Sequence, residues 1–375
     1  MAIAGTNIQL DATEGMDMIT TVEKVTTPYF SGGSETLLAA NIQSASNLTA
    51  TNETYFFGIS NTTTPTVQEF DVTFGSLRGY GAKVEANTKS ETEAVYKQYA
   101  SLLLAPTEVT GGFIISRNNS LATAPTNAKV SSGRDQEIFV LSARRSNMKD
   151  RINKGTWTIT LSGSNSNVGG TDGSPKLDLT DDSANKTPTS TPVGDRYNIV
   201  SGSAGTISGS GASDRTYGFF YPDTGIMVFS QQELSGSIPG DSGSKADVAI
   251  FKDGTHAGFA VGTTTNANSK NALRFINCLQ PLGAKLSFRD EEDQVSAQYF
   301  CRVRSGHANF SNNPTFVSGS QNKLRNDKMR GNPQTFITSV QMYNNAGDMV
   351  AVGHLSKPLK KNFSSEATIK VKLTY

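Results

Sequence analysis

The last nine residues of the chain alternate between apolar and polar side chains, and this period constrains the fold more than any other feature of the sequence. After Ala367, the apolar positions are Ile369, Val371, Leu373 and Tyr375. The polar positions between them are Thr368, Lys370, Lys372 and Thr374. Such alternation is typical of a β-strand with one buried face, because successive side chains point to opposite sides. The segment predicts a final strand that closes a sheet, with lysines that discourage unspecific pairing.

Short apolar segments separated by turn residues recur through the chain. Three pairs of such segments predict β-hairpins: residues 55–59 with 68–74, 217–221 with 226–229, and 335–343 with 349–354. Only 36% of the residues are hydrophobic and 18% are charged, and Gly, Ser, Thr and Asn, which favour turns and extended segments over helices, are abundant. The expected fold is therefore mainly β, a β-rich α+β protein with antiparallel sheets, hairpins, a few short helices and long Gly/Ser-rich loops.

One helix is expected at residues 91–104, before Pro106. Its apolar positions at helical spacing predict the packed side: Val95, Tyr99, Leu102 and Leu103. Trp157, Ile159 and Leu161 alternate with threonines in a strand pattern. We therefore interpret Trp157 as a core anchor, with a ligand platform as the alternative.

Composition changes along the chain predict four regions. Residues 1–54 form a polar N-terminal arm, and residues 55–162 form a β-rich region with one helix. Residues 163–195 are rich in Gly, Ser, Asn, Asp and Pro and indicate a linker or long loop. Residues 196–375 form a C-terminal β-rich domain. A length of 375 residues fits one large domain or two smaller ones.

Charge and hydropathy exclude several classes of partner. Lys and Arg total 34 and Asp and Glu total 33, so the chain lacks the basic excess that nucleic-acid binding normally requires. No run of apolar residues is long enough to span a membrane, and the N-terminus does not resemble a signal peptide. We therefore expect neither nucleic acid nor membrane as a partner, and synthesis and assembly in a cytoplasm.

Two cysteines are too few for a four-cysteine zinc site. Cys278 and Cys301 both lie in apolar segments, which indicates small buried hydrophobic residues. A disulfide between them is the alternative.

The tetrapeptide Gly-Asp-Ser-Gly at residues 240–243 is similar to the nucleophile motif of trypsin-like proteases. That chemistry needs a histidine base, which precedes the serine in those enzymes, but no histidine precedes Ser242. The three histidines are His256, His307 and His354, of which the first two fall in Gly-containing loops and the third ends a predicted strand. We interpret all three as structural or surface residues.

The acidic residues show no recognised metal-binding spacing. Asp178, Asp181 and Asp182 offer oxygen ligands for calcium, but the spacing and final glutamate of an EF-hand are absent. The densest acidic cluster, at residues 290–293, indicates a solvated turn between strands. The sequence therefore predicts no catalytic residues, no metal site and no cofactor.

Several segments between residue 95 and the C-terminus resemble virion structural proteins of large contractile-tailed phages, of the myovirus type that infects marine cyanobacteria. These segments are residues 95–99, 155–163, 197–202, 217–225, 309–316, 330–333, 355–359 and the terminal strand. The strongest of them are those after residue 309. The family label brings no established catalytic residues.

This resemblance implies a non-enzymatic structural component of a phage virion, associated with the tail or baseplate. Its expected partners are copies of itself and other virion proteins of the tail, baseplate or neck, which assemble symmetrically. Strand addition is one mechanism by which the N-terminal arm and the C-terminal region would make contact. The alternatives are a receptor- or glycan-binding tail adhesin and a tail-associated hydrolase.

Overall fold

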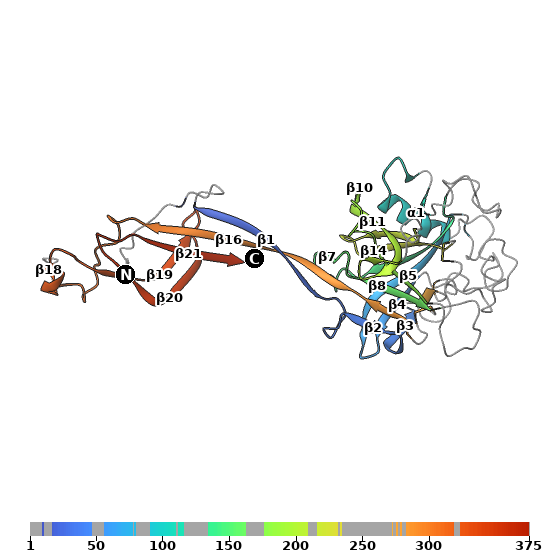
Figure 1. Ribbon diagram of the computed structural model, residues 1–375, viewed down its shortest axis with the longest axis horizontal. Coiled ribbons are helices and arrows are strands. Elements are labelled where there is room, and N and C mark those ends of the chain that lie inside the picture. Colours follow the sequence, from blue (N-terminus) through green and yellow to red (C-terminus); the bar gives the residue numbers. More distant parts are fainter. Residues whose placement is uncertain are drawn as a thin grey trace. The chain divides into compact units, whose positions relative to one another are not determined.

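The chain forms two compact units in a computed structural model (Figure 1). Unit 1 comprises Met1–Lys24 and Asp293–Tyr375, and unit 2 comprises Val25–Glu292. Unit 2 is therefore inserted between two segments of unit 1. The structure describes residues 10, 17–46, 56–77, 79, 91–109, 112–115, 134–162, 176–208, 216–231, 233–234, 272, 275–276, 278–279, 283–318 and 323–374.

Unit 2 is built on a single sheet of 13 strands. In chain order they are β2 (Thr36–Leu38), β3 (Ile42–Ser46), β4 (Phe56–Asn61), β5 (Thr64–Ser76), β6 (Glu137–Ala143), β8 (Thr158–Ser162), β9 (Lys176–Asp181), β10 (Thr189–Thr191), β11 (Gly194–Ser203), β12 (Thr206–Ile207), β13 (Gly218–Tyr221), β14 (Ile226–Ser230) and β15 (Lys285–Ser287). Their order in the sheet is β2-β15-β8-β9-β11-β13-β14-β6-β5-β4-β3, and β10 and β12 pair with β11. Every pair in this sheet is antiparallel.

This sheet is nearly closed on itself. Strands β2 and β3 stand at opposite ends of the strand order, yet only the short 3-10 helix η1 (Ala39–Asn41) separates them in the chain. Because three residues span only a short distance, the two edges of the sheet must lie near each other. The backbone N–H of Ala39 donates to the carbonyl of Ala284 (3.1 Å), and that of Thr62 donates to Asn41 (3.0 Å). The result is a barrel-like sheet.

Two hydrophobic clusters cover opposite faces of its central strands. In β6, Phe139 and Leu141 belong to the larger cluster, whereas Ile138 and Val140 belong to the smaller one. Strands β13 and β14 divide their side chains in the same way. The helix α1 (Glu91–Leu103) supplies residues of the smaller cluster and packs against β5 (Figure 1). Burial on both faces explains why these strands are continuously apolar instead of alternating.

The predicted helix is confirmed, and its predicted packing side is partly right. Leu103 is fully buried and Tyr99 packs, partly buried, against the smaller cluster, whereas the prediction is wrong for Leu102, which is 46% exposed. Tyr96 is fully buried instead, because its hydroxyl donates to the carbonyl of Asp135 (2.6 Å) and accepts the N–H of Phe113 (2.9 Å). These two hydrogen bonds connect α1 to residues 113 and 135, and they favour the orientation of the helix in which Tyr96 faces inward.

The strands that lie outside the 13-stranded sheet form smaller sheets. Strands β1 (Met18–Pro28), β16 (Arg289–Val303) and β21 (Ala367–Thr374) form one, to which the short β7 (Arg151–Ile152) adds by pairing with the first residues of β16. The two others are hairpins: β17 (Val317–Ser318) with β18 (Lys323–Leu324), and β19 (Thr335–Tyr343) with β20 (Met349–Lys361). The 3-10 helix η6 (Asp327–Met329) lies between these hairpins in the chain.

The mainly β fold class and all three predicted hairpins are confirmed. In the turn between β13 and β14, Gly225 adopts a φ of 67°, a conformation that favours glycine. The predicted terminal strand is confirmed as β21, which pairs antiparallel with β16 over residues Ser296 to Val303.

The two units divide the chain differently from the four regions expected from composition. Strands β2 and β3 lie within residues 1–54, and β9 and β10 lie within residues 163–195. The boundary at Glu292 falls inside the expected C-terminal domain. Composition can only divide a chain into consecutive segments, whereas strands pair across large distances in the sequence. Leu286, for example, pairs with both Leu37 and Ile159.

In the part of the chain that the structure describes, no helix has the length and apolar character needed to cross a membrane.

Candidate assembly surface

The candidate nucleophile and one of the three histidines cannot be located in the described part of the chain. Residues 240–243 and His256 lie outside the described residues. His307 lies in a turn in which its N–H donates to the carbonyl of Arg304 (3.0 Å). The prediction that His354 ends a strand is wrong, because β20 continues to Lys361.

Of the three candidate calcium ligands, Asp178 lies within β9, Asp181 is its last residue and Asp182 follows it. Asp181 accepts hydrogen bonds from the backbone N–H of Gly155 (2.8 Å) and of Ser183 (3.0 Å), and burial raises its pKa. Asp182 accepts both the backbone N–H (2.9 Å) and the side-chain amide (2.8 Å) of Asn198. These carboxylates therefore hold the backbone in place. Among the described residues no three His, Cys, Asp or Glu side chains gather as metal ligands would.

The prediction of a solvated turn at residues 290–293 is wrong. Asp290 and Glu291 are buried in β16, where they pair with β7. Glu291 accepts a hydrogen bond from the amide of Asn153 (2.5 Å) and forms an ion pair with Arg151 (3.4 Å). Loss of solvent raises the pKa of Asp290 from 3.8 to about 7.

Trp157 packs as predicted, inside unit 2. It is fully buried, stacks on Phe288 at a centroid distance of 5.8 Å and meets Phe220 edge to face at 5.3 Å. Cys278 is also buried, whereas Cys301 is only half-buried. The two cysteines do not form a disulfide with each other.

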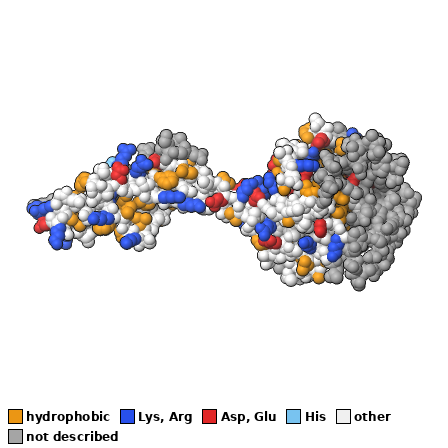
Figure 2. All heavy atoms as spheres, viewed as in Figure 1, with side chains coloured by type: hydrophobic (Ala, Val, Ile, Leu, Met, Phe, Trp, Pro, Cys, Tyr) orange, Lys and Arg blue, Asp and Glu red, His pale blue; other side chains and the backbone are white. Residues whose placement is uncertain are grey.

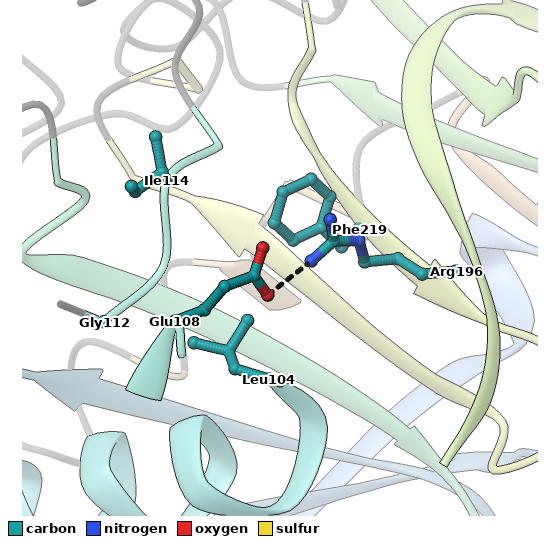
Figure 3. A pocket seen from close by; sticks show the side chains of 6 residues that line it. All are labelled: Leu104, Glu108, Gly112, Ile114, Arg196 and Phe219. Carbon is teal, nitrogen blue, oxygen red and sulfur yellow. Dashed lines mark hydrogen bonds and ion pairs between the residues drawn. The ribbon is translucent and has the colours of Figure 1, made fainter. Parts of the chain in front are cut away.

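A small pocket lies beside α1 in unit 2 (Figure 3). The guanidinium of Arg196 lies 4.3 Å from the ring centroid of Phe219 and forms an ion pair with Glu108 at 3.4 Å. The other lining residues are Leu104, Gly112 and Ile114. Its volume is about 40 Å³, whereas sites for organic ligands hold roughly 300–1,000 Å³. The pocket has room for water but not for an organic substrate.

The clearest functional feature is the apolar surface of unit 1 (Figure 2). Of the 13 large hydrophobic side chains that the described residues expose, only three belong to unit 2. The other ten are Ile19, Val22, Phe310, Phe336, Tyr343, Met349, Val350, Val352, Leu359 and Phe363. Large exposed apolar patches on soluble proteins mark sites of interaction.

The described residues of unit 1 form no hydrophobic core of the size its strands would suggest. Neither of the two hydrophobic clusters includes a side chain of this unit. The buried apolar residues described in it are few and none is aromatic: Ala297, Val303, Val317, Ala367 and Ile369. Part of its interior is polar instead, because Lys361 is fully buried and donates to the carbonyls of Ser305 (3.0 Å) and Asn362 (2.8 Å) and to the side chain of Asn309 (2.9 Å).

The end of the β19–β20 hairpin next to its turn has one face lined by exposed apolar side chains. Tyr343 pairs with Met349, and Gln341 pairs with Val352, so these four side chains share one face. The Tyr343 hydroxyl donates to Oε1 of Gln341 (2.7 Å) along that face. Tyr343, Met349 and Val352 are each more than half exposed. We call this surface, formed by Gln341, Tyr343, Met349 and Val352, the tip face.

The sequence predicts these two strands but does not indicate which of their residues form a site. The apolar run at residues 349–352 was the available signal, because it follows the turn without the polar partners that a solvent-exposed strand normally has.

No protein-family model, no curated protein and no solved structure matches this chain significantly. The described residues thus form a two-unit β protein, in which one unit is well packed and the other exposes most of the large apolar side chains.

Proposed function

We propose that this chain is a non-enzymatic structural component of a phage particle, associated with its tail or baseplate. It acts by assembling with copies of itself and with other proteins of the tail, baseplate or neck. The observation that carries this proposal is the concentration of exposed apolar side chains on unit 1, which has few buried ones of its own.

Unit 1 gains little stability from burying its own apolar side chains. Burial of apolar surface is the main favourable contribution to folding, and small units with little buried surface are marginally stable. A two-stranded hairpin such as β19–β20 is itself marginal in water unless something packs against it. Association with another chain removes the exposed side chains from water and stabilises the unit by mass action. Such interfaces resemble a domain core divided between two chains.

The assignment to a phage particle is supported by the resemblance of the sequence to virion structural proteins. Four of the resembling segments lie in unit 1: residues 309–316, 330–333, 355–359 and the terminal strand. The segment at 355–359 includes the irregular part of β20 that faces Ile337 and Ser339. The part of the chain with the strongest resemblance is thus also the part with the exposed apolar surface.

Purified particles provide the test. Phage particles isolated by density gradient should contain the chain at a fixed ratio to the major tail protein, measured by quantitative mass spectrometry. A tagged chain with Val350→Lys should enter the particles less well than a tagged chain with Leu102→Lys, since Leu102 is an exposed residue of unit 2. Absence of the chain from washed particles would contradict the proposal.

A tail adhesin that binds receptors or glycans is the second candidate, and one observation favours it. Phe310 is 53% exposed in a loop of unit 1 and meets Phe316 edge to face at 5.7 Å. Exposed aromatic rings in loops are suited to stacking on sugars. Binding of the purified chain to host envelope, lost on Phe310→Ala but kept on Phe336→Ala, would support this role.

A further inference from the structure

We propose that the tip face packs against the tip face of a second copy of this chain. This inference rests on the proposed function, because it names the partner of one surface of unit 1. Four observations carry it: the shortage of a core, the absence of charge on this face, the basic character of another face, and the blocked edge of β20.

The tip face is neutral, so two identical copies of it can meet without opposing like charges. None of Gln341, Tyr343, Met349 and Val352 carries a formal charge, and the next pair on this face is Ser339 with His354. Apolar surfaces attract without regard to direction, so a copy of the same face is a suitable partner. Its three large side chains are each more than half exposed, and neither hydrophobic cluster of the described residues includes them.

Another face of unit 1 is unsuited to a second copy. On the sheet of β16 and β21, Lys370 pairs with Phe300 and Lys372 pairs with Gln298. Arg302 lies on the same face, opposite Thr368. Two copies meeting there would oppose like charges, which is unfavourable. The charge distribution therefore selects the tip face for contacts between identical chains.

The edge of β20 is unsuited to strand addition. Between the pairs Ile337–Leu359 and Ser339–His354, one residue of β19 opposes residues 355–358 of β20. This irregularity contains Lys357 and Pro358, and a proline offers no N–H to a neighbouring strand. Bulges, lysines and prolines are the devices by which proteins protect sheet edges. The edge of β20 is therefore a poor template for an incoming strand, whereas its face is open.

The purified full chain provides the experiment, in a dilution series followed by sedimentation velocity. The wild-type chain should form a defined oligomer that dissociates on dilution. Val352→Lys and Val352→Glu should each raise the dissociation constant by roughly 30-fold or more, as expected for a central residue of an interface. The matched control, Leu102→Lys on α1, should leave the dissociation constant unchanged.

Mixing the two charge variants gives the decisive result. An equal mixture of Val352→Lys and Val352→Glu chains should associate more tightly than either variant alone, because opposite charges then meet across the contact. Only a contact between copies of this face predicts that recovery. Val352→Thr, which keeps the shape and strand preference of valine, should give an intermediate dissociation constant and serves if the charged variants fail to fold.

The outcomes separate this inference from the proposed function. A wild-type chain that stays monomeric at every concentration, or a mixture that fails to recover association, overturns the self-contact. If that monomeric chain is nevertheless found in washed particles, the structural role stands and only the identity of the partner is wrong. If the chain forms the charge-sensitive oligomer but is absent from particles, the self-contact stands and the structural role fails.

Discussion

The two units are built from the same kind of strand, but one buries its apolar side chains and the other exposes them. Unit 2 contains 47 of the 52 buried apolar residues among those described, whereas unit 1 contains five and exposes most of the large ones. Both units consist mainly of antiparallel strands with apolar positions at regular spacing. The difference lies in what covers those positions. In unit 2 it is a curled sheet and a helix of the same chain, and in unit 1 we propose that it is another chain. An apolar strand face thus indicates that something packs on it, without indicating which molecule does so.

The largest expected effect is on the core of unit 2. Phe70 is 1% exposed and lies 4.9 Å from Tyr29 and 5.0 Å from Phe288, measured between ring centroids. Phe70→Ala should lower the free energy of unfolding of unit 2 by about 3–5 kcal/mol, because it leaves a cavity. Urea unfolding followed by the fluorescence of Trp157, the single tryptophan, measures this unit directly. Phe336→Ala, a change at a residue of unit 1 that is 56% exposed, should leave that transition nearly unchanged. Equal losses in both variants would contradict the comparison.

A smaller effect on stability is expected from the buried lysine of unit 1. Lys361 is fully buried, whereas most buried side chains of unit 2 are apolar. Lys361→Met removes three hydrogen bonds and leaves the acceptors Ser305, Asn309 and Asn362 without this donor. Unit 1 should lose about 1–3 kcal/mol of stability. Hydrogen exchange of the backbone amides in β20 and β21 measures this loss, with Lys360→Met at the exposed neighbour as control. If both substitutions accelerate exchange equally, the buried lysine has no special role.

The pH dependence of unit 2 should depend on Asp290. Its pKa is raised from 3.8 to about 7 in the folded protein, so the folded state holds the proton more tightly than the unfolded state. The contribution of Asp290 to stability is therefore fully present below pH 3.8 and is lost as the pH rises through about 7. Asp290→Asn should remove this part of the pH dependence and stabilise the protein most, relative to wild type, above pH 7. Urea titrations at several pH values, followed by Trp157 fluorescence, check the sign. A parallel pair of pH profiles would contradict it.

The smallest effect is expected at the pocket beside α1. The Glu108 side chain is 41% exposed, so its ion pair with Arg196 is partly screened by solvent. Glu108→Gln should change the stability of unit 2 by less than about 1 kcal/mol, as is usual for pairs near the surface. Thermal unfolding gives the measurement. A loss as large as that of Phe70→Ala would show that the pocket is part of the core.

Features that depend on neighbouring residues in the sequence were predictable, whereas pairings between residues far apart in the sequence were not. The alternation in β21 and the turn at Gly225 are encoded within a few residues, and so is the burial of Trp157. The pairing of Leu286 with Leu37 brings together segments nearly 250 positions apart, and no local period reveals it. The burial of Asp290 depends on β7 in the same way.

The tip face was likewise only partly predictable from the sequence. Tyr343 and Met349 were correctly placed in a hairpin, but a period of two cannot tell whether its apolar side is covered. That distinction requires the arrangement of the whole unit, since exposure depends on all neighbouring elements.

The insertion of unit 2 within unit 1 has a consequence for synthesis on the ribosome. Residues 25–292 leave the ribosome after the first segment of unit 1 and before the second. At roughly 5–20 residues per second, that interval lasts on the order of tens of seconds, during which the barrel-like sheet can fold while its nascent chain is still growing. The hairpin of β19 and β20 is translated only afterwards. While unit 2 folds, neighbouring nascent chains on one messenger RNA therefore do not yet expose the tip face to each other, and the proposed contact between copies can form only after β19 and β20 have been translated.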